Sequence, residues 1–182
     1  MEVHFGHRVS REGWWSFETH PRMERTKRRI HERCLPCLAG LLDQLKTDRT
    51  EIDLPHAWDC WKVVAAAPDE TTCMEILGQL AEDHPDLYLH GKLGGRRDRY
   101  GTSALVLHAE GETERDRLVA CLRQTLERHF PQVPLRLSRA CADPYAELLG
   151  PWQDWTLPCP IRHLEAVPRV VRRLRELLYG GG

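Results

Sequence analysis

The chain has no long apolar run and no excess of charge of either sign. None of its apolar stretches approaches the roughly 18 consecutive residues that a membrane-spanning helix requires, and its N-terminus lacks the charged-then-apolar pattern of a secretory signal. The 182 residues include 26 Lys and Arg against 27 Asp and Glu, which gives a formal net charge of -1. We therefore expect a soluble, cytoplasmic protein without a membrane partner, and the net charge gives no reason for it to bind nucleic acid.

Several enzyme signatures are absent as well. The sequence contains neither an H-E-x-x-H motif nor a serine nucleophile elbow nor a G-x-x-x-x-G-K-[ST] phosphate loop. Its ten histidines are scattered, and a single histidine is more often a hydrogen-bonded structural residue than a catalytic base. No catalytic residue is therefore predicted, and the sequence leaves open whether the protein is an enzyme.

A pattern of strands and helices occupies the middle of the chain, residues 57–138. Its order is strand, helix, strand, strand, helix, strand. The predicted strands are 61–67, 87–90, 103–108 and 135–138, and the predicted helices are 72–84 and 113–130. Thr72 and Glu75 have the spacing of a capping box at the start of the first helix, and Thr113 is expected to cap the second.

The connection between the second and third strands decides the expected fold class. A parallel α/β sheet needs a helix between successive strands, whereas a glycine-rich loop separates these two. We therefore predict an α+β protein with a ferredoxin-like split βαβ core, in which a four-stranded antiparallel sheet carries two helices on one face.

Helical extensions are predicted on both sides of this core. Residues 1–56 form an N-terminal extension, in which Pro36 is expected to kink or break the helix near Leu35. Residues 139–182 form a C-terminal extension that ends in an amphipathic helix. We expect both extensions to pack with the core as one unit, and a dimer contact is the alternative for the C-terminal helix.

Seven cysteines make a metal site the strongest chemical hypothesis. Their odd number and the size of the chain argue against a disulfide framework, so we expect reduced thiols. Cys34 and Cys37 form a Cys-x-x-Cys hook, and Cys159 and His163 have the Cys-x3-His spacing of zinc sites. If the terminal helices are neighbours, these four residues are predicted to bind a structural zinc ion, with His31 as a competing fourth ligand.

Two other interpretations of the Cys-x-x-Cys hook stay open. Cys34 and Cys37 also fall on the apolar stripe of their helix, where free cysteine acts as a small buried hydrophobe. The second interpretation is thioredoxin-like redox chemistry. That use requires a strand directly before the motif, and no strand is predicted there.

A basic loop is the second candidate site. Cations and one aromatic ring between residues 92 and 100 match the groups that bind phosphate oxygens and stack on bases. The candidate residues are Lys92, Arg96, Arg97, Arg99 and Tyr100. A further basic stretch covers residues 22–33 on the first helix. The alternative is a solvated loop tip, and the predicted strands lack the aromatic pattern of RNA-recognition domains.

Two functions follow from these candidates. The first is a non-enzymatic ligand-binding or regulatory module, with a structural metal, that takes a small ligand or associates with itself. The second is an RNA- or phosphate-binding protein that uses the basic loop 92–99 and the basic helix 22–33. Strongly salt-dependent retention on nucleic acid would favour the second function over the first.

Overall fold

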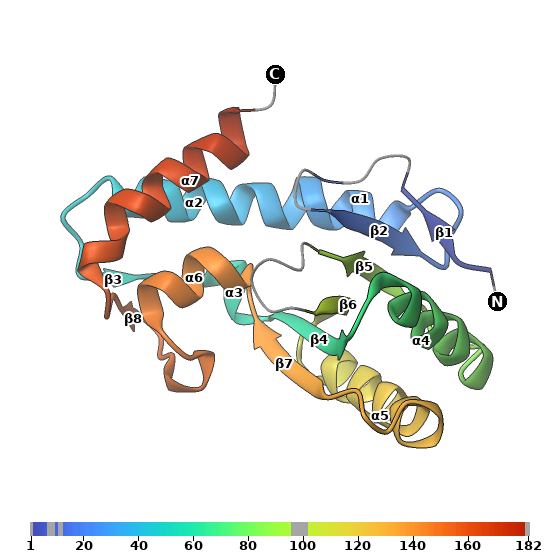
Figure 1. Cartoon of the computed structure of the whole chain (residues 1–182). Coiled ribbons are helices and arrows are strands. Elements are labelled where there is room, and N and C mark those ends of the chain that lie inside the picture. The colour runs from blue at the N-terminus through green and yellow to red at the C-terminus, as the bar shows by residue number, and fades with distance from the viewer. Residues whose placement is uncertain (1, 7–9, 11–12, 96–101, 181–182) are drawn as a thin grey trace. The chain divides into compact units, whose positions relative to one another are not determined.

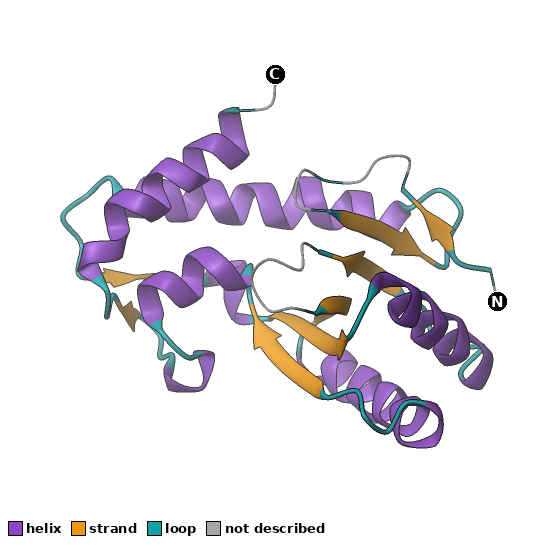
Figure 2. Ribbon diagram, viewed as in Figure 1, coloured by secondary structure: helices purple, strands orange, loops and turns teal. Residues whose placement is uncertain are grey.

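The computed structural model describes residues 2–6, 10, 13–95 and 102–180, and the chain divides into two compact units. Unit 1 comprises Met1–Lys27 and Trp61–Ser138, and unit 2 comprises Arg28–Cys60 and Arg139–Gly182. Figure 1 follows the elements along the chain, and Figure 2 separates helices from strands. Each unit therefore joins segments that are distant in sequence.

An antiparallel sheet forms the centre of unit 1. Over the described residues it has six strands in the order β1-β2-β5-β6-β4-β7, and the β1–β2, β2–β5 and β5–β6 pairs are antiparallel. Their bounds are β1 His4–Phe5, β2 Trp14–Glu18, β4 Cys60–Ala67, β5 His90–Gly94, β6 Ser103–Glu110 and β7 Leu135–Arg139. The α+β class is confirmed. The four-stranded ferredoxin-like sheet is not, because the N-terminal segment adds β1 and β2.

Strand β5 differs from its predicted position. Residues 87–90 were expected to form this strand, but β5 begins at His90 and includes two glycines assigned to the following loop. Gly91 is required here because a Cβ atom would collide with the carbonyl oxygen of Val106 on β6. Phe17 of β2 lies opposite Gly91 on the other side. The glycine therefore permits a close approach between strands.

Two helices cover the sheet of unit 1. Helices α4 (Glu70–Asp83) and α5 (Glu112–His129) pack against β6 and against each other. The side chain of Asp69 accepts the N–H of Thr72 at 2.8 Å, so Asp69 caps α4 in place of the predicted capping box. Gly111 precedes α5 without a capping side chain, so the predicted Thr113 cap is also wrong.

Unit 2 is mainly helical. Its longer helices are α2 (Leu35–Leu45), α6 (Ala142–Leu149) and α7 (Val167–Tyr179), and α7 packs on both α2 and α6. The π-helical segment η1 (Arg29–Cys34) leads directly into α2, and Cys34 and Leu35 both keep right-handed helical dihedral angles. The chain therefore does not break into two helices near Leu35, and what changes there is the type of helix. Pro36 lies in the first turn of α2 and has no N–H to donate to the preceding π-helical turn.

Short elements complete unit 2 around one hydrophobic core. They are β3 Glu51–Ile52, α3 Pro55–Trp58, η3 Trp152–Asp154, β8 Cys159–Pro160 and η4 Leu164–Ala166. Strands β3 and β8 pair antiparallel. Leu41, Leu42, Tyr145, Leu174 and their neighbours are buried together in this core. None of the helices described in either unit has the length and apolarity needed to cross a membrane.

Candidate functional site

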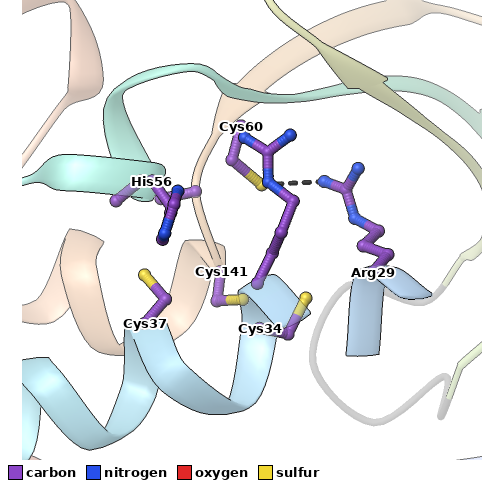
Figure 3. A pocket seen from close by; sticks show the side chains of 9 residues that line it. Arg29, Cys34, Cys37, His56, Cys60 and Cys141 are labelled. Carbon is purple, nitrogen blue, oxygen red and sulfur yellow. Dashed lines mark hydrogen bonds between the residues drawn. The ribbon is translucent and has the colours of Figure 1, made fainter. Parts of the chain in front are cut away.

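Four cysteines of unit 2 line a single cavity. They are Cys34 at the end of η1, Cys37 in α2, Cys60 at the start of β4 and Cys141 at the N-cap of α6 (Figure 3). The space open to the centre of a water-sized sphere is about 10 Å³, which is roughly enough for one water molecule. The cavity therefore suits a single ion and is too small for an organic cofactor.

Local backbone structure brings these cysteines together. Cys34 and Cys37 are three residues apart, and this spacing puts them on one face of a helix. The N–H of Ala140 donates to the carbonyl oxygen of Cys60 at 2.6 Å, which places Cys60 beside the segment that carries Cys141. The guanidinium of Arg139 lies 4.0 Å from the centre of the Trp58 ring. This contact also joins the segment before Cys60 to the segment before Cys141.

Each of the four sulfur atoms has a polar partner. Cys37 Sγ lies 3.0 Å from the hydroxyl oxygen of Tyr145, and Arg29 Nη2 donates to Cys60 Sγ at 2.8 Å. The thiols of Cys34 and Cys141 are hydrogen-bonded to each other. Figure 3 shows the sulfur of Cys141 directed toward that of Cys34. The cluster therefore consists of one thiol pair and two thiols with other partners.

The surroundings keep these thiols protonated. Its hydrogen bond with Cys141, followed by burial, raises the pKa of Cys34 far above the ordinary value of a thiol. Burial raises the pKa of Cys37 to about 11, although the Tyr145 hydroxyl and the charge of Arg33 act in the opposite direction. Both thiols are therefore neutral at pH 7 unless a metal ion displaces their protons.

Two arginines add positive charge to the cavity wall. Arg29 and Arg33 both line it, and only 4% of Arg29 is exposed. Burial of a cation is costly unless negative charge lies nearby. Thiolates at the cysteines would supply such negative charge. The guanidinium of Arg29 already donates a hydrogen bond to Cys60 Sγ.

The sequence-predicted metal ligands fall into two groups. Cys34 and Cys37 line the cavity, but Cys159 is buried in β8 opposite Ile52. His163 is exposed, and its Nδ1 lies 3.2 Å from Glu165 Oε1. Neither Cys159 nor His163 lines the cavity, and the alternative ligand His31 is exposed on η1. The structure therefore brings Cys60 and Cys141, and not the predicted second pair, to the Cys-x-x-Cys hook.

Cys60 and Cys141 carry no motif spacing, yet the predicted strands contained a signal. Cys60 directly precedes the strand predicted at 61–67, and Cys141 follows the one predicted at 135–138. The bonds from Ala140 to Cys60 and from Ala66 to Pro134 show that these strands run in opposite directions. The start of one therefore lies beside the end of the other, and pairing them would have located both cysteines.

The side chains do not form a ready coordination sphere. Within the described ranges, no three His, Cys, Asp or Glu side chains are placed so that they could hold a metal ion as they stand. The four sulfurs instead make the hydrogen bonds given above. Metal binding therefore requires the thiols to lose their protons and to rotate about their Cα–Cβ bonds.

The basic loop gives less support to a binding site. Lys92 belongs to β5, and its Nζ lies 4.0 Å from the centre of the Trp14 ring. The other candidates in the loop, Arg96, Arg97, Arg99 and Tyr100, lie outside the described residues. In the basic stretch 22–33, Arg25 pairs with Glu114 at 3.1 Å. Two of these cations, Arg25 and the cavity residue Arg29, therefore have partners within the protein.

Comparisons with known proteins add no functional assignment. No model of a known family, no curated protein sequence and no solved structure matches this chain. Function is therefore inferred from the residues and geometry of the chain itself.

Proposed function

We propose that unit 2 binds one zinc ion through Cys34, Cys37, Cys60 and Cys141, and that the protein is a binding or regulatory module stabilised by this metal. One observation carries the proposal: four cysteines from three separate segments line a cavity of single-ion size. Structural zinc sites commonly consist of four cysteine thiolates in a tetrahedron. Four cysteines line the cavity, which is the number of ligands in such a site.

Charge balance supports the same ligand set. Four thiolates and one Zn²⁺ carry a net charge of about -2, and the cavity wall contains two arginines, Arg29 and Arg33. Their guanidinium groups offset this charge in a partly buried place, where an uncompensated anion would be costly.

Neighbouring polar groups are placed to hold the ligands once the metal is bound. The Tyr145 hydroxyl lies beside Cys37 Sγ, and Arg29 donates to Cys60 Sγ. Such outer hydrogen bonds orient metal ligands and raise metal affinity. The ion would connect α2, the start of β4 and the start of α6, and it would contribute directly to the stability of unit 2.

Elemental analysis of reduced protein tests the ligand set. The whole wild-type chain is expected to bind about one zinc ion, as a structural site of this type does. Cys60→Ser and Cys141→Ser are expected to lose the metal, whereas Cys159→Ser and His163→Ala retain it. The ligand set predicted from sequence spacing requires the opposite result, because it contains Cys159 and His163 but neither of the other two.

Two further measurements make the result decisive. Circular dichroism shows whether each serine variant retains its helices, and Co²⁺ absorption reports thiolate bonds in the wild type independently of any variant. A reduced wild-type chain that binds neither zinc nor cobalt contradicts the proposal. So does the presence of iron with acid-labile sulfide, which would identify a cluster instead of a single ion.

We also propose that unit 1 is a ferredoxin-like domain enlarged by two N-terminal strands. The support is the order β5-β6-β4-β7, in which each predicted strand takes part, together with the packing of α4 and α5 on the same strand. Strands β1 and β2 extend this sheet beyond β5. An experimental structure in which β4 and β6 run parallel would contradict this assignment.

A further inference from the structure

We infer that Cys34 and Cys141 form a reversible disulfide when the protein meets hydrogen peroxide, and that this oxidation expels the zinc ion. The release of zinc rests on the proposed function. The disulfide does not, because it depends only on the two thiols. The site would then be a peroxide-sensitive switch in unit 2.

The arrangement of the four thiols selects this pair. Cys34 and Cys141 are hydrogen-bonded to each other, and Figure 3 shows their sulfur atoms next to one another. Cys37 is instead paired with the Tyr145 hydroxyl, and Cys60 accepts from Arg29. Among the four, the sulfurs of Cys34 and Cys141 therefore contact each other, while the other two are directed to oxygen and nitrogen.

This choice differs from the one that the sequence motif favours. A Cys-x-x-Cys hook ordinarily pairs its own two cysteines, which here are Cys34 and Cys37. The Cys37 sulfur has the Tyr145 hydroxyl as its hydrogen-bond partner, whereas the partner of Cys34 is Cys141. A bond from Cys34 to Cys141 would also join η1 to α6 and so connect the two chain segments of unit 2.

The two thiols are accessible to a small oxidant. Cys34 and Cys141 are both half-buried, in contrast to Cys73 and Cys159, which are fully buried. Both line a cavity with room for roughly one water molecule. Hydrogen peroxide is little larger than water, whereas a bulky disulfide such as oxidised glutathione does not fit this space.

The reaction balances with peroxide as the only oxidant. One cysteine gives up its proton, or its bond to zinc, and attacks a peroxide oxygen as a thiolate. The O–O bond breaks, the sulfur becomes a sulfenic acid, and the departing hydroxide takes up a proton to form one water. The second sulfur then displaces the hydroxyl group of the sulfenic acid, which forms the S–S bond and releases a second water. The two sulfurs together lose two electrons, and the two peroxide oxygens gain them.

Loss of zinc follows from the loss of ligands. A disulfide sulfur is not a thiolate and does not hold zinc. Oxidation of Cys34 and Cys141 leaves only Cys37 and Cys60 of the four proposed ligands. Reduction by a dithiol restores all four, so the switch is reversible.

The test treats the reduced wild-type chain with hydrogen peroxide, once with zinc bound and once after a chelator has removed the metal. Proteolysis without reductant and mass spectrometry identify the joined cysteines, and a zinc-sensitive dye follows the metal. We expect a Cys34–Cys141 peptide pair in both samples, and loss of zinc in step with its formation in the first. Dithiothreitol is expected to restore both thiols.

Variants of the metal-free chain add matched controls. Cys37→Ser and Cys121→Ser are expected to retain the Cys34–Cys141 pair, whereas Cys141→Ser abolishes it. Formation of a Cys34–Cys37 bond, or of sulfinic acids without any disulfide, overturns the inference. Because the wild-type chain alone gives this answer, a variant that fails to fold does not obscure it.

The outcomes separate this inference from the proposed function. A chain that holds no zinc but joins Cys34 to Cys141 refutes the metal centre and the release step while confirming the disulfide. A chain that holds zinc through the proposed ligands and forms no such disulfide refutes the switch alone.

Discussion

The cysteines of the two units lie in different surroundings. In unit 1, Cys73 is fully buried in α4 among apolar neighbours such as Ile76 and Leu77. In unit 2, Cys34 and Cys60 lie in a cavity wall that also contains arginines. The Cys73 thiol also has a hydrogen bond with the backbone of Gly94, and a single buried thiol of this kind acts as a small hydrophobe. Thiols gathered beside cations have the surroundings of metal ligands or of reactive groups.

The units also differ in how they satisfy buried polar groups. In unit 1, the buried carboxylate of Glu18 accepts the N–H groups of Arg25 and Thr26 and the hydroxyl of Tyr88. In unit 2, Cys60 Sγ accepts from Arg29, and Cys37 Sγ is hydrogen-bonded to the Tyr145 hydroxyl. We therefore expect dependence on a metal ion to be confined to unit 2.

The largest expected effect belongs to the proposed zinc ion and its removal. A chelator is expected to lower the free energy of local opening in α2 and α6 by about 3 kcal/mol or more, because a bound ligand at 100 to 1,000 times its Kd stabilises the folded state by roughly this amount. Hydrogen exchange measured by mass spectrometry reports protection of each helix separately. Helices α4 and α5 of unit 1 serve as the internal control. Equal loss of hydrogen-exchange protection in both units would contradict the expectation that the metal ion stabilises unit 2 alone.

Loss of the Glu18 charge is the next largest effect, and it concerns unit 1. Burial raises the pKa of Glu18, but hydrogen bonds from Tyr88 and from the N–H groups of Thr26 and Arg25 outweigh it, so the pKa is lowered overall. A lowered pKa stabilises the folded state above the ordinary pKa of a carboxyl group, and this stabilisation disappears as the pH falls through the folded-state value. Glu18→Gln is expected to cost about 2 kcal/mol at pH 7.

Unfolding in urea at pH 7 and at pH 3 measures this contribution. The difference between wild type and Glu18→Gln should shrink at the lower pH, because pH 3 lies below the ordinary pKa of a glutamate, so that the unfolded chain binds a proton that the folded state binds less readily. Glu165→Gln is a matched control because that carboxylate is exposed in unit 2. A constant difference between wild type and Glu18→Gln at both pH values would show that the charge of Glu18 contributes nothing.

Tyr145→Phe sharpens the comparison within the site. This change keeps the buried ring but removes the hydroxyl beside Cys37 Sγ. Loss of such an outer hydrogen bond is expected to weaken zinc binding about 10-fold. Titration against a competing chelator measures the affinity. Tyr88→Phe, which removes a hydroxyl bonded to Glu18 in unit 1, should leave the affinity unchanged, and an equal effect of both variants would exclude a specific role for Tyr145.

Periodic segments of the chain were predictable from sequence. The strands expected at 61–67, 103–108 and 135–138 and both helices of unit 1 are present, because their apolar residues repeat at the strand or helix period. Strand β2 was missed, since its pairing depends on the exposed edge of β5. Strand β5 itself was displaced in the prediction because Gly91 and Gly94 are typical of loops.

Half of the candidate metal site was predictable for a similar reason. Cys34 and Cys37 carry their own spacing, so a local pattern identifies them. Cys60 and Cys141 become neighbours only through the hydrogen bond between Ala140 and Cys60, which is a contact between distant segments. Cys159 had a plausible local spacing with His163, but it packs into the core of unit 2 instead. Local spacing cannot distinguish these cases, whereas strand pairing can.

The smallest expected effect concerns Cys73 of unit 1 at alkaline pH. Burial raises its pKa from 9.0 to about 11. The folded state therefore holds this proton more tightly than the unfolded chain, so the stability that depends on it is present below pH 9 and is lost as the pH rises toward 11. The wild type has a higher free energy of unfolding than Cys73→Ala, and this difference is expected to shrink by roughly 1 kcal/mol between pH 9 and pH 10.

Urea unfolding of both proteins at pH 8, 9 and 10, with a chelator present to remove the contribution of zinc, measures this change. Ile76→Val is the matched control, because it also removes buried volume from α4 but has no titratable group. Its cost should stay constant over the same pH range, whereas the cost of Cys73→Ala should decrease. If the two costs changed in parallel, the thiol of Cys73 would not be shielded from water in the folded state. The contrast between a single buried thiol in unit 1 and a cluster of thiols beside arginines in unit 2 would then fail.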